Sequence, residues 1–381
     1  MNVTQKHTVA LISKEAIILL LYMAMSAMVL NVFMQTRSLE EGSPSFGLTP
    51  MLDGTAKRPF VYRQLVPITV NFLVSLIPQE QHQAYVHYHL DRFHLKQIYF
   101  ERAKYPNTNK GKELWTPTYS LKFHLVYLIM FASLLACMYC MRWLLSEVFK
   151  ETDSFYALAP LVFMALLPLS FVTGNFFYDF PELFFLTILL LTAMKGWYST
   201  WILLLPLAVL NKESNLLVPL LYFSVIIGSL GVWRNRIFLG LSIVISSIVY
   251  FYIKMLYQDN PGSTVVFRLS KNIDFWLNPK NYLLWSDFYA PLIPFPRGLN
   301  IAWIALILST IFLAWKSKPT VIKWLFWTAL LINVPLLLLF CHADEMRNLS
   351  FLFIPTFLLM SHSLRYLLFP HRETAPNNLP V

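Results

Sequence analysis

Residues 15–33 read EAIILLLYMAMSAMVLNVF, and residues 120–149 read SLKFHLVYLIMFASLLACMYCMRWLLSEVF. As helices, both runs are long enough to cross the hydrocarbon layer of a bilayer, which takes about 20 mostly apolar residues. The composition agrees, because 57% of the 381 residues are hydrophobic and only 13% are charged. An ordinary soluble domain carries roughly 25% charged residues. We therefore predict an all-α polytopic membrane protein, with residues 1–381 forming one integral membrane domain.

The same reading along the whole chain predicts about ten transmembrane helices. Two polar segments interrupt the series and are predicted to lie outside the cytoplasm: a large first loop at 34–119, and a second loop at 258–299 that we expect to form short surface helices. The predicted spans are about 13–35, 119–147, 155–173, 181–195, 197–211, 213–232, 237–257, 300–316, 321–341 and 349–368.

The basic residues predict the orientation of these spans. Cytoplasmic loops carry an excess of Lys and Arg, and such residues recur in alternate short loops if the N-terminus is cytoplasmic. These residues are Arg142, Lys150, Lys195, Arg234, Arg236, Lys316, Lys318, Lys323, Arg365 and Arg372. Both termini are therefore predicted to be cytoplasmic. The formal net charge of +10 is explained in the same way, and we predict no nucleic-acid partner.

Within the first large loop, residues 65–77 are apolar but too few to cross the membrane. Counting them as a span would reverse every later orientation. We expect a re-entrant or surface-lying helix here, followed by a second, amphipathic helix over 80–105.

Three short outer turns carry ionisable residues between apolar segments. They read TGNFFYDFPE at 173–182, NKESN at 211–215 and CHADEMRN at 341–348. Ionisable groups near membrane depth are costly and often mark a functional site. The alternative is that they are solvated loop tips or ion pairs that lock helix ends. Together with the first loop, these turns supply the candidate substrate- or phosphate-binding residues Arg58, Arg63, Tyr178, Glu182, Lys212, Glu213, His342, Asp344, Glu345 and Arg347.

The residue types in these segments favour phosphate chemistry. The arginine and lysine residues, which include Lys57, suggest that the site binds an anion. Phosphate is the anion expected at a lipid–water boundary. The carboxylates Asp53 and Asp179 can act as a general base. A base that deprotonates a hydroxyl, beside cations that stabilise a phosphate leaving group, is the minimum needed to move a sugar from a phosphate carrier.

A divalent metal ion is a possible cofactor, although none is required by the sequence. His87, Asp91 and His94 share one face of the predicted helix at 80–105, near His82 and His89. This spacing is compatible with a metal site. It is also what a polar helix face contains by chance.

The architecture resembles the C-type glycosyltransferases, the GT-C fold. The motifs on which this resemblance rests are LDG at 52–54, YRQLVP at 62–67 and the pair Lys212-Glu213. The resemblance implies an inverting enzyme of the bacterial inner (plasma) membrane. Its donor would be a polyprenyl-phosphate-linked sugar and its acceptor a glycan or lipid on the outer face. It also implies that Asp53 is the catalytic base, with Glu40 and Glu41 as alternatives, and that Asp179 is a second catalytic acid residue.

Two other functions fit parts of the pattern. A polysaccharide polymerase or ligase of the cell envelope also combines many spans with a large basic outer loop, although that loop usually lies late in the chain. A transporter would favour inverted repeats and charges near mid-span, whereas the charges here gather near helix ends.

Overall fold

The fold is helical in a computed structural model that describes residues 3–36, 39, 43, 45–86, 116–150, 154–170, 176–229, 232–286, 294–296 and 298–369. The helices are α1 (Val3–Thr36), α2 (Leu48–Leu52), η1 (Phe60–Tyr62), α3 (Leu65–Ser75), α4 (Gln79–Val86), α7 (Pro117–Phe149), α8 (Ser154–Ser170), α9 (Asp179–Lys195), α10 (Tyr198–Asn211), η3 (Glu213–Leu217), α11 (Val218–Leu221), α12 (Phe223–Ser229), α13 (Val232–Leu256), α14 (Leu269–Leu277), η4 (Pro279–Tyr282), α15 (Ile301–Phe312), η5 (Trp315–Ser317), α16 (Thr320–Phe340), η6 (Met346–Leu349) and α17 (Ser350–Leu368).

Five segments in the described part of the chain are helical, long and apolar enough to cross a membrane. They are Ile12–Met34, Pro117–Phe149, Trp233–Leu256, Thr320–Phe340 and Met346–Leu368. Shorter apolar helices cover Leu65–Ser75, Phe155–Pro168, Tyr198–Asn211 and Ile301–Phe312. The chain is therefore a helical membrane protein. The number of ten spans remains a prediction.

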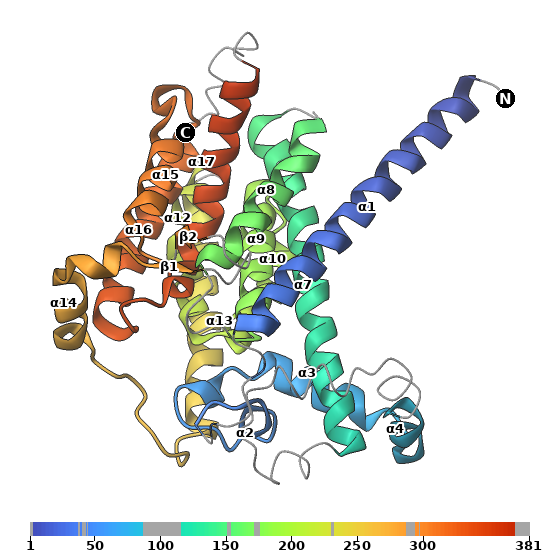
Figure 1. The fold of residues 1–381 in the computed structure, drawn as a ribbon, viewed down its shortest axis with the longest axis vertical. Helices are drawn as coiled ribbons and strands as arrows, with labels where there is room; N and C mark the ends of the chain where they lie inside the picture. Colours follow the sequence, from blue (N-terminus) through green and yellow to red (C-terminus); the bar gives the residue numbers. More distant parts are fainter. Residues whose placement is uncertain are drawn as a thin grey trace.

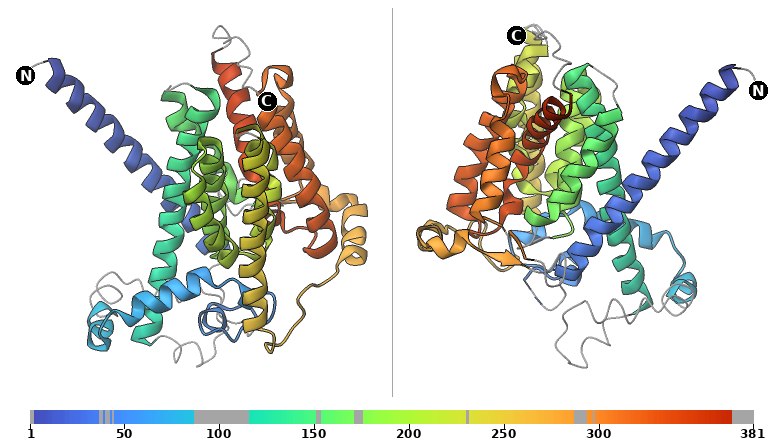
Figure 2. Two further views of the ribbon diagram at one scale, coloured as in Figure 1. Left: turned by 180° about the vertical axis from the view of Figure 1, so that it is seen from behind. Right: turned by 45° about the horizontal axis from the view of Figure 1, so that its top comes forward.

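The long helices form a bundle in which α7 packs along α9, α16 along α17, and α10 against α9 and α13 (Figure 1). Helix α1 contacts α7 and α8 and then diverges from the bundle toward its N-terminus, as both further views show (Figure 2). Helix α1 begins and α17 ends at one end of the bundle, while α2, α3 and α4 lie at the other end. Which end faces the cytoplasm remains a prediction from charge.

Buried aromatic residues hold the helices together and satisfy their own polar atoms. The Tyr22 hydroxyl in α1 donates to the Ala157 carbonyl in α8 at 2.7 Å. The Trp201 indole in α10 donates to the Ser242 hydroxyl in α13 at 3.1 Å. A buried Tyr or Trp needs such a partner for its polar end. These bonds therefore fix the register between neighbouring helices.

Helix α3 lies crosswise at the end of the bundle, packed against α2, α7 and α10 (Figure 1). Its 11 residues reach about 16 Å as a helix, well short of the ~30 Å hydrocarbon layer. Val66 and Val70 are buried, whereas Ile68 and Phe72 are exposed. The short apolar helix expected over 65–77 is therefore present, and its re-entrant or surface-lying position stays a prediction. Helix α4 covers the start of the amphipathic helix predicted at 80–105, and the remainder lies outside the described residues.

The prediction of one continuous helix over 213–232 is wrong. The described part of this segment is broken into η3, α11 and α12. Pro219 lies in the first turn of α11, and proline has no N–H with which to continue the hydrogen-bond ladder of a preceding turn. The apolar run alone predicted a membrane span without showing that break.

The second large loop contains the predicted short helices, α14 and η4. It also contains an unpredicted antiparallel pair of two-residue strands, β1 (Trp285–Ser286) and β2 (Phe295–Pro296), within a fold that is otherwise helical. The chain before α14 is tied to the first loop. The Asn260 amide donates to the Gly54 and Ala56 carbonyls, each at 2.9 Å.

Candidate functional site

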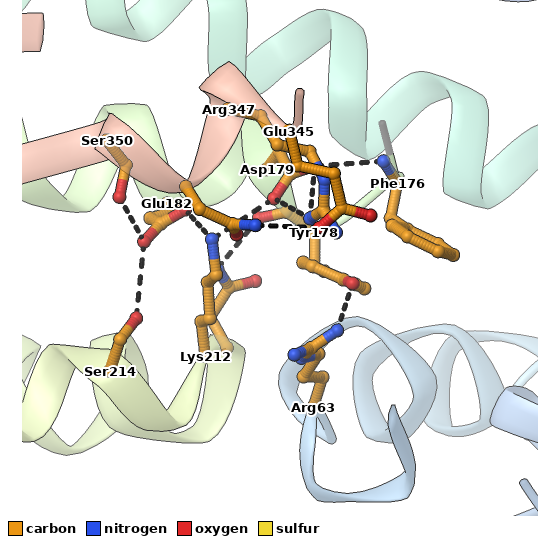
Figure 3. A network of polar contacts seen from close by, with 12 residues as sticks. Arg63, Phe176, Tyr178, Asp179, Glu182, Lys212, Ser214, Glu345, Arg347 and Ser350 are labelled. Atoms are coloured by element: carbon orange, nitrogen blue, oxygen red, sulfur yellow. Dashed lines mark hydrogen bonds and ion pairs between the residues drawn. The ribbon is translucent and has the colours of Figure 1, made fainter. Parts of the chain in front are cut away.

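Four segments far apart in sequence meet near the end of the bundle that carries α3. The turn between η1 and α3 supplies Arg63, the start of α9 supplies two acids and a tyrosine, the junction of α10 and η3 supplies a lysine and a glutamate, and the η6 region supplies the rest (Figure 3). We call this set the buried ion network; its members are Arg63, Tyr178, Asp179, Glu182, Lys212, Glu213, Glu345 and Arg347.

Asp179 lies at the centre of the buried ion network and is only 2% exposed. Nη1 of Arg347 is 3.1 Å from each of its carboxylate oxygens, and Nζ of Lys212 is 3.3 Å from Oδ1. The Phe176 N–H donates to Oδ2 at 2.9 Å. Asp179 also stands in the first turn of α9, where the helix dipole favours negative charge. Two cations, a backbone N–H and the dipole therefore all stabilise the ionised carboxylate.

Glu182 lies one turn further along α9 and shares Lys212 with Asp179. The Lys212 Nζ donates to Glu182 Oε2 at 2.6 Å, and the Ser350 hydroxyl donates to Oε1 at 2.9 Å. Burial disfavours the charged form of Lys212, but attraction from Glu182 and then Asp179 outweighs it, so the pKa of Lys212 is raised. The amine is therefore held as a cation.

Arg63 brings the first loop into the buried ion network. Its Nε and Nη2 donate to the two Glu213 oxygens at 3.1 and 3.0 Å, a bidentate arrangement, and Nη1 donates to the Tyr178 hydroxyl. Planar guanidinium groups suit this paired geometry. Burial raises the pKa of the Tyr178 hydroxyl to about 12, so it stays protonated at neutral pH.

A stack of side chains joins the part of the network around Arg63 to the part around Asp179. The Arg63 guanidinium carbon is 4.3 Å from the centre of the Tyr178 ring. The Tyr178 and Phe176 rings are stacked with centres 5.2 Å apart, and the Arg347 guanidinium carbon is 4.7 Å from the Phe176 ring centre. Each arginine thus makes a cation–π contact, worth about 0.5–2 kcal/mol. The order Arg63–Tyr178–Phe176–Arg347 ties the first loop physically to the Asp179 half.

The turn that carries Arg347 packs beside α16 and does not extend past the end of that helix. The Asn333 side chain accepts from the Phe351 N–H at 3.0 Å and donates to the Asn348 carbonyl at 2.6 Å, so it holds the start of α17. Asn333 is seven residues before the end of α16 at Phe340, which is about 10 Å along a helix. The chain from Phe340 to Arg347 therefore turns back along α16, and the turn that carries Arg347 lies between the helices.

The buried ion network has a partly exposed edge, and three buried polar atoms in or beside it lack a hydrogen-bond partner among the described residues. Glu213 keeps 25% of its side chain exposed and Glu345 keeps 15%. Nε of Arg347 and the side-chain oxygens of Asn211 and Asn215 have no hydrogen-bond partner among the described residues. Buried polar atoms are normally satisfied, so these three can be satisfied by water or by a bound polar ligand.

Of the twelve residues predicted from sequence, eight belong to the buried ion network and four lie outside it. Asp53 is half exposed and pairs with Lys122 at 3.6 Å. Arg58 donates to the Gly262 carbonyl at 2.8 Å and so holds the two large loops together. His342 and Asp344 lie in the turn before η6, where their backbone carbonyls accept from Glu345 and Met346. Their roles in binding or catalysis remain predictions.

Several residues that build the site were not predicted. Phe176 stacks within it, Ser350 and Ser214 contact Glu182, and Asn333 holds the start of α17. An isolated asparagine inside an apolar run was the one available signal for Asn333. Ser214 lies in the turn 211–215 that was singled out for its charges, whereas Ser350 carried no signal, because isolated hydroxyls are common in membrane helices.

Within the described residues, no group of three or more His, Cys, Asp and Glu side chains is placed to hold a metal ion. His82 instead contacts the Thr118 hydroxyl at 3.1 Å and the Ile77 carbonyl at 3.0 Å. The predicted metal-binding face of His87, Asp91 and His94 lies outside the described residues.

Comparison with known proteins yields no match to a family model, to a curated protein or to a solved structure.

Proposed function

We propose that the protein is a membrane glycosyltransferase that moves a sugar from a polyprenyl-phosphate carrier to a glycan or lipid acceptor, with inversion at the anomeric carbon. The convergence of paired cations and carboxylates from four distant segments near one end of a membrane bundle carries this proposal. The outer face of the inner membrane is the proposed location.

The energetics favour function over simple stabilisation. Desolvating charges is costly, and well-packed apolar side chains of similar volume often stabilise a protein as well as a buried ion pair does. Ionisable residues at membrane depth are therefore usually tied to a function. Seven charged side chains are brought together here at the ends of apolar helices, so stability alone is a poor reason for their presence.

The cations fit the phosphate of the donor. Arg63 and Arg347 flank the aromatic pair, and Nε of Arg347 has no described partner. Planar guanidinium groups match phosphate oxygens in a bidentate manner. In the proposed reaction they stabilise the negative charge that builds on the phosphate as the bond to the sugar breaks.

The carboxylates supply the base. It removes the proton from the acceptor hydroxyl, the oxygen bonds to the anomeric carbon, and the phosphate leaves with the electrons of the broken C–O bond. Asp53 and Asp179 are the proposed catalytic carboxylates. Asp53 has the freer side chain, whereas Asp179 is held by Arg347 and Lys212, an arrangement suited to organising the cations around the phosphate.

Mass spectrometry of glycolipids and envelope polysaccharide from cells with and without the protein tests the proposal. One sugar should disappear on deletion and return with the wild-type gene, but not with Asp53→Asn or Asp179→Asn. The matched control is Glu147→Gln, which removes an acid paired with Lys150 and Lys195 near the end of α7. It should restore the sugar. Unchanged glycans on deletion would refute the proposal. Unaltered product in both aspartate variants would refute the assigned residues.

A further inference from the structure

Helix α14 has three distinct faces. At 100° per residue, Asn272 and Trp276 point to one side, Ile273 and Leu277 to a second, and Lys271 and Asp274 to a third, with Ser270 at the border between the second and the third. Asn272 is buried, whereas Leu277 is 77% exposed and Ile273 is 43% exposed. Ser270, Lys271 and Asp274 are also exposed. One face of α14 therefore packs against the rest of the protein, while an apolar face and a charged face lie side by side and are exposed.

The protein-facing side joins α14 to the end of α16. The Asn272 amide donates to the Leu338 carbonyl at 3.0 Å and to the Cys341 carbonyl at 2.9 Å. These carbonyls belong to the last turn of α16 and the residue after it, where helical carbonyls lack partners within the helix. The Arg268 N–H donates to the Leu339 carbonyl at 2.8 Å. Helix α14 is therefore fixed to the point at which a candidate membrane span ends.

Exposed apolar residues also lie in the segments that precede and follow α14 in the chain. Phe267 precedes the helix, is largely exposed, and has its ring 6.3 Å from that of Phe340 at the end of α16. The exposed apolar residues of the whole strip are Val265, Val266, Phe267, Ile273, Leu277, Leu283, Leu284 and Trp285. A strip of this kind marks an interaction surface.

The charges and the position point to a lipid occupant. Arg268, Lys271 and Lys280 accompany a single acid, Asp274, over the described residues 265–286. Basic residues beside a span are attracted to anionic headgroups, and tryptophan favours the membrane–water interface. A helix with adjoining apolar and charged faces lies in the plane of that interface, with the apolar side among the acyl chains.

We propose that α14 and its flanking residues are an interfacial anchor, seated in the lipid surface beside the end of α16. Ile273 and Leu277 insert among the acyl chains, while Lys271 and Asp274 face water. The anchor also fixes the chain that leads to the buried ion network, because the Trp276 indole donates to the Ala343 carbonyl at 3.4 Å.

Spin labels on single cysteines test this directly. The native cysteines Cys137, Cys140 and Cys341 are first replaced by serine or alanine, and the full chain is reconstituted in phosphatidylcholine–phosphatidylglycerol vesicles. Labels at positions 273 and 277 are compared with labels at 271 and 274. Position 251 serves as the lipid reference, because Phe251 is exposed on the candidate span of α13.

The expected result is a high ratio of oxygen to nickel-chelate accessibility at 273, 277 and 251, and a low ratio at 271 and 274. Nickel-chelate access at all four α14 positions would show that the helix stands in water and would overturn the proposal. Exclusion of both reagents from 273 and 277 would also overturn it, because a protein partner would then cover the face. The label at 251 confirms correct insertion in every preparation.

Discussion

The turn that carries Asp179 and the turn that carries Asp53 place two similar carboxylates in opposite surroundings. Asp179 is 2% exposed and contacts Arg347, Lys212 and a backbone N–H. The Asp53 side chain is 51% exposed and, among the described residues, pairs with Lys122 at 3.6 Å. Water can replace a lost partner at Asp53 but not at Asp179. The same residue type therefore organises a site in one place and stays available to a ligand in the other.

The largest effect is expected from Arg347→Ala, which leaves a buried carboxylate short of a cation. Breaking a buried pair in this way costs about 3–5 kcal/mol. Cys137 and Cys140 are buried, so the temperature at which a maleimide dye labels them reports unfolding. That temperature should fall sharply, whereas Lys122→Ala, which removes the partner of Asp53, should leave it nearly unchanged. Equal shifts would contradict the comparison.

The double variant Asp179→Leu with Arg347→Met separates the two contributions. With both charges gone, no fully buried carboxylate is left short of a cation, since Glu345, which also loses Arg347, keeps 15% of its side chain exposed. Much of the stability lost in Arg347→Ala should therefore return. The same maleimide assay measures it. A double variant as unstable as the single one would show that Lys212 and Glu182 depend on the missing pair.

Arg63→Lys should have an intermediate effect. Lysine keeps the charge but loses the bidentate contact with Glu213 and the planar stack on Tyr178. Loss of charge-assisted hydrogen bonds costs roughly 1.5–3 kcal/mol. Arg58→Lys is the matched control, because Arg58 contacts a backbone carbonyl instead of a carboxylate. A larger loss at Arg58 would contradict the importance of the stack.

Alkaline pH should weaken the Asp179 region through Tyr178 and Lys212. The pKa of Tyr178 is raised to about 12 by burial, and that of Lys212 is raised because Glu182 and Asp179 outweigh its burial. The unfolded chain loses these protons near pH ~10, while the folded protein keeps them, so stability falls as pH rises through about 10–12. Melting curves across this range should show the fall, and Tyr178→Phe should reduce it. An unchanged fall in Tyr178→Phe would exclude Tyr178 as a contributor.

Asp53→Asn should have the smallest effect on stability, at most about 1 kcal/mol, because exposed ion pairs contribute little. If Asp53 is the base, the same variant loses the glycan product while its melting temperature is unchanged. Product formation at the wild-type level would leave Asp179 as the proposed base. This variant therefore tests whether the exposed or the buried carboxylate carries out the chemistry.

Much of the buried ion network was accessible from sequence, because its members interrupt apolar segments. Asp179, Lys212 and Arg347 could each be singled out by that local contrast. The pairing of the network residues could not be predicted, since partners are far apart in the chain; Arg63 and Glu213, for example, are 150 positions apart. The stack of Arg63, Tyr178, Phe176 and Arg347 was likewise hidden, because it depends on how the turn between η1 and α3, the residues before α9, and η6 approach one another.

The sequence by itself determined that this is a helical membrane protein and which of its ionisable residues stand out, because helix length, hydropathy and charge are local properties of the chain. Only the tertiary structure decided that the apolar run from 213 to 232 is broken, that Asp53 is exposed, and that Asp179 is enclosed by two cations. Burial and pairing depend on neighbours that are distant in the chain, and those neighbours set what each charge contributes.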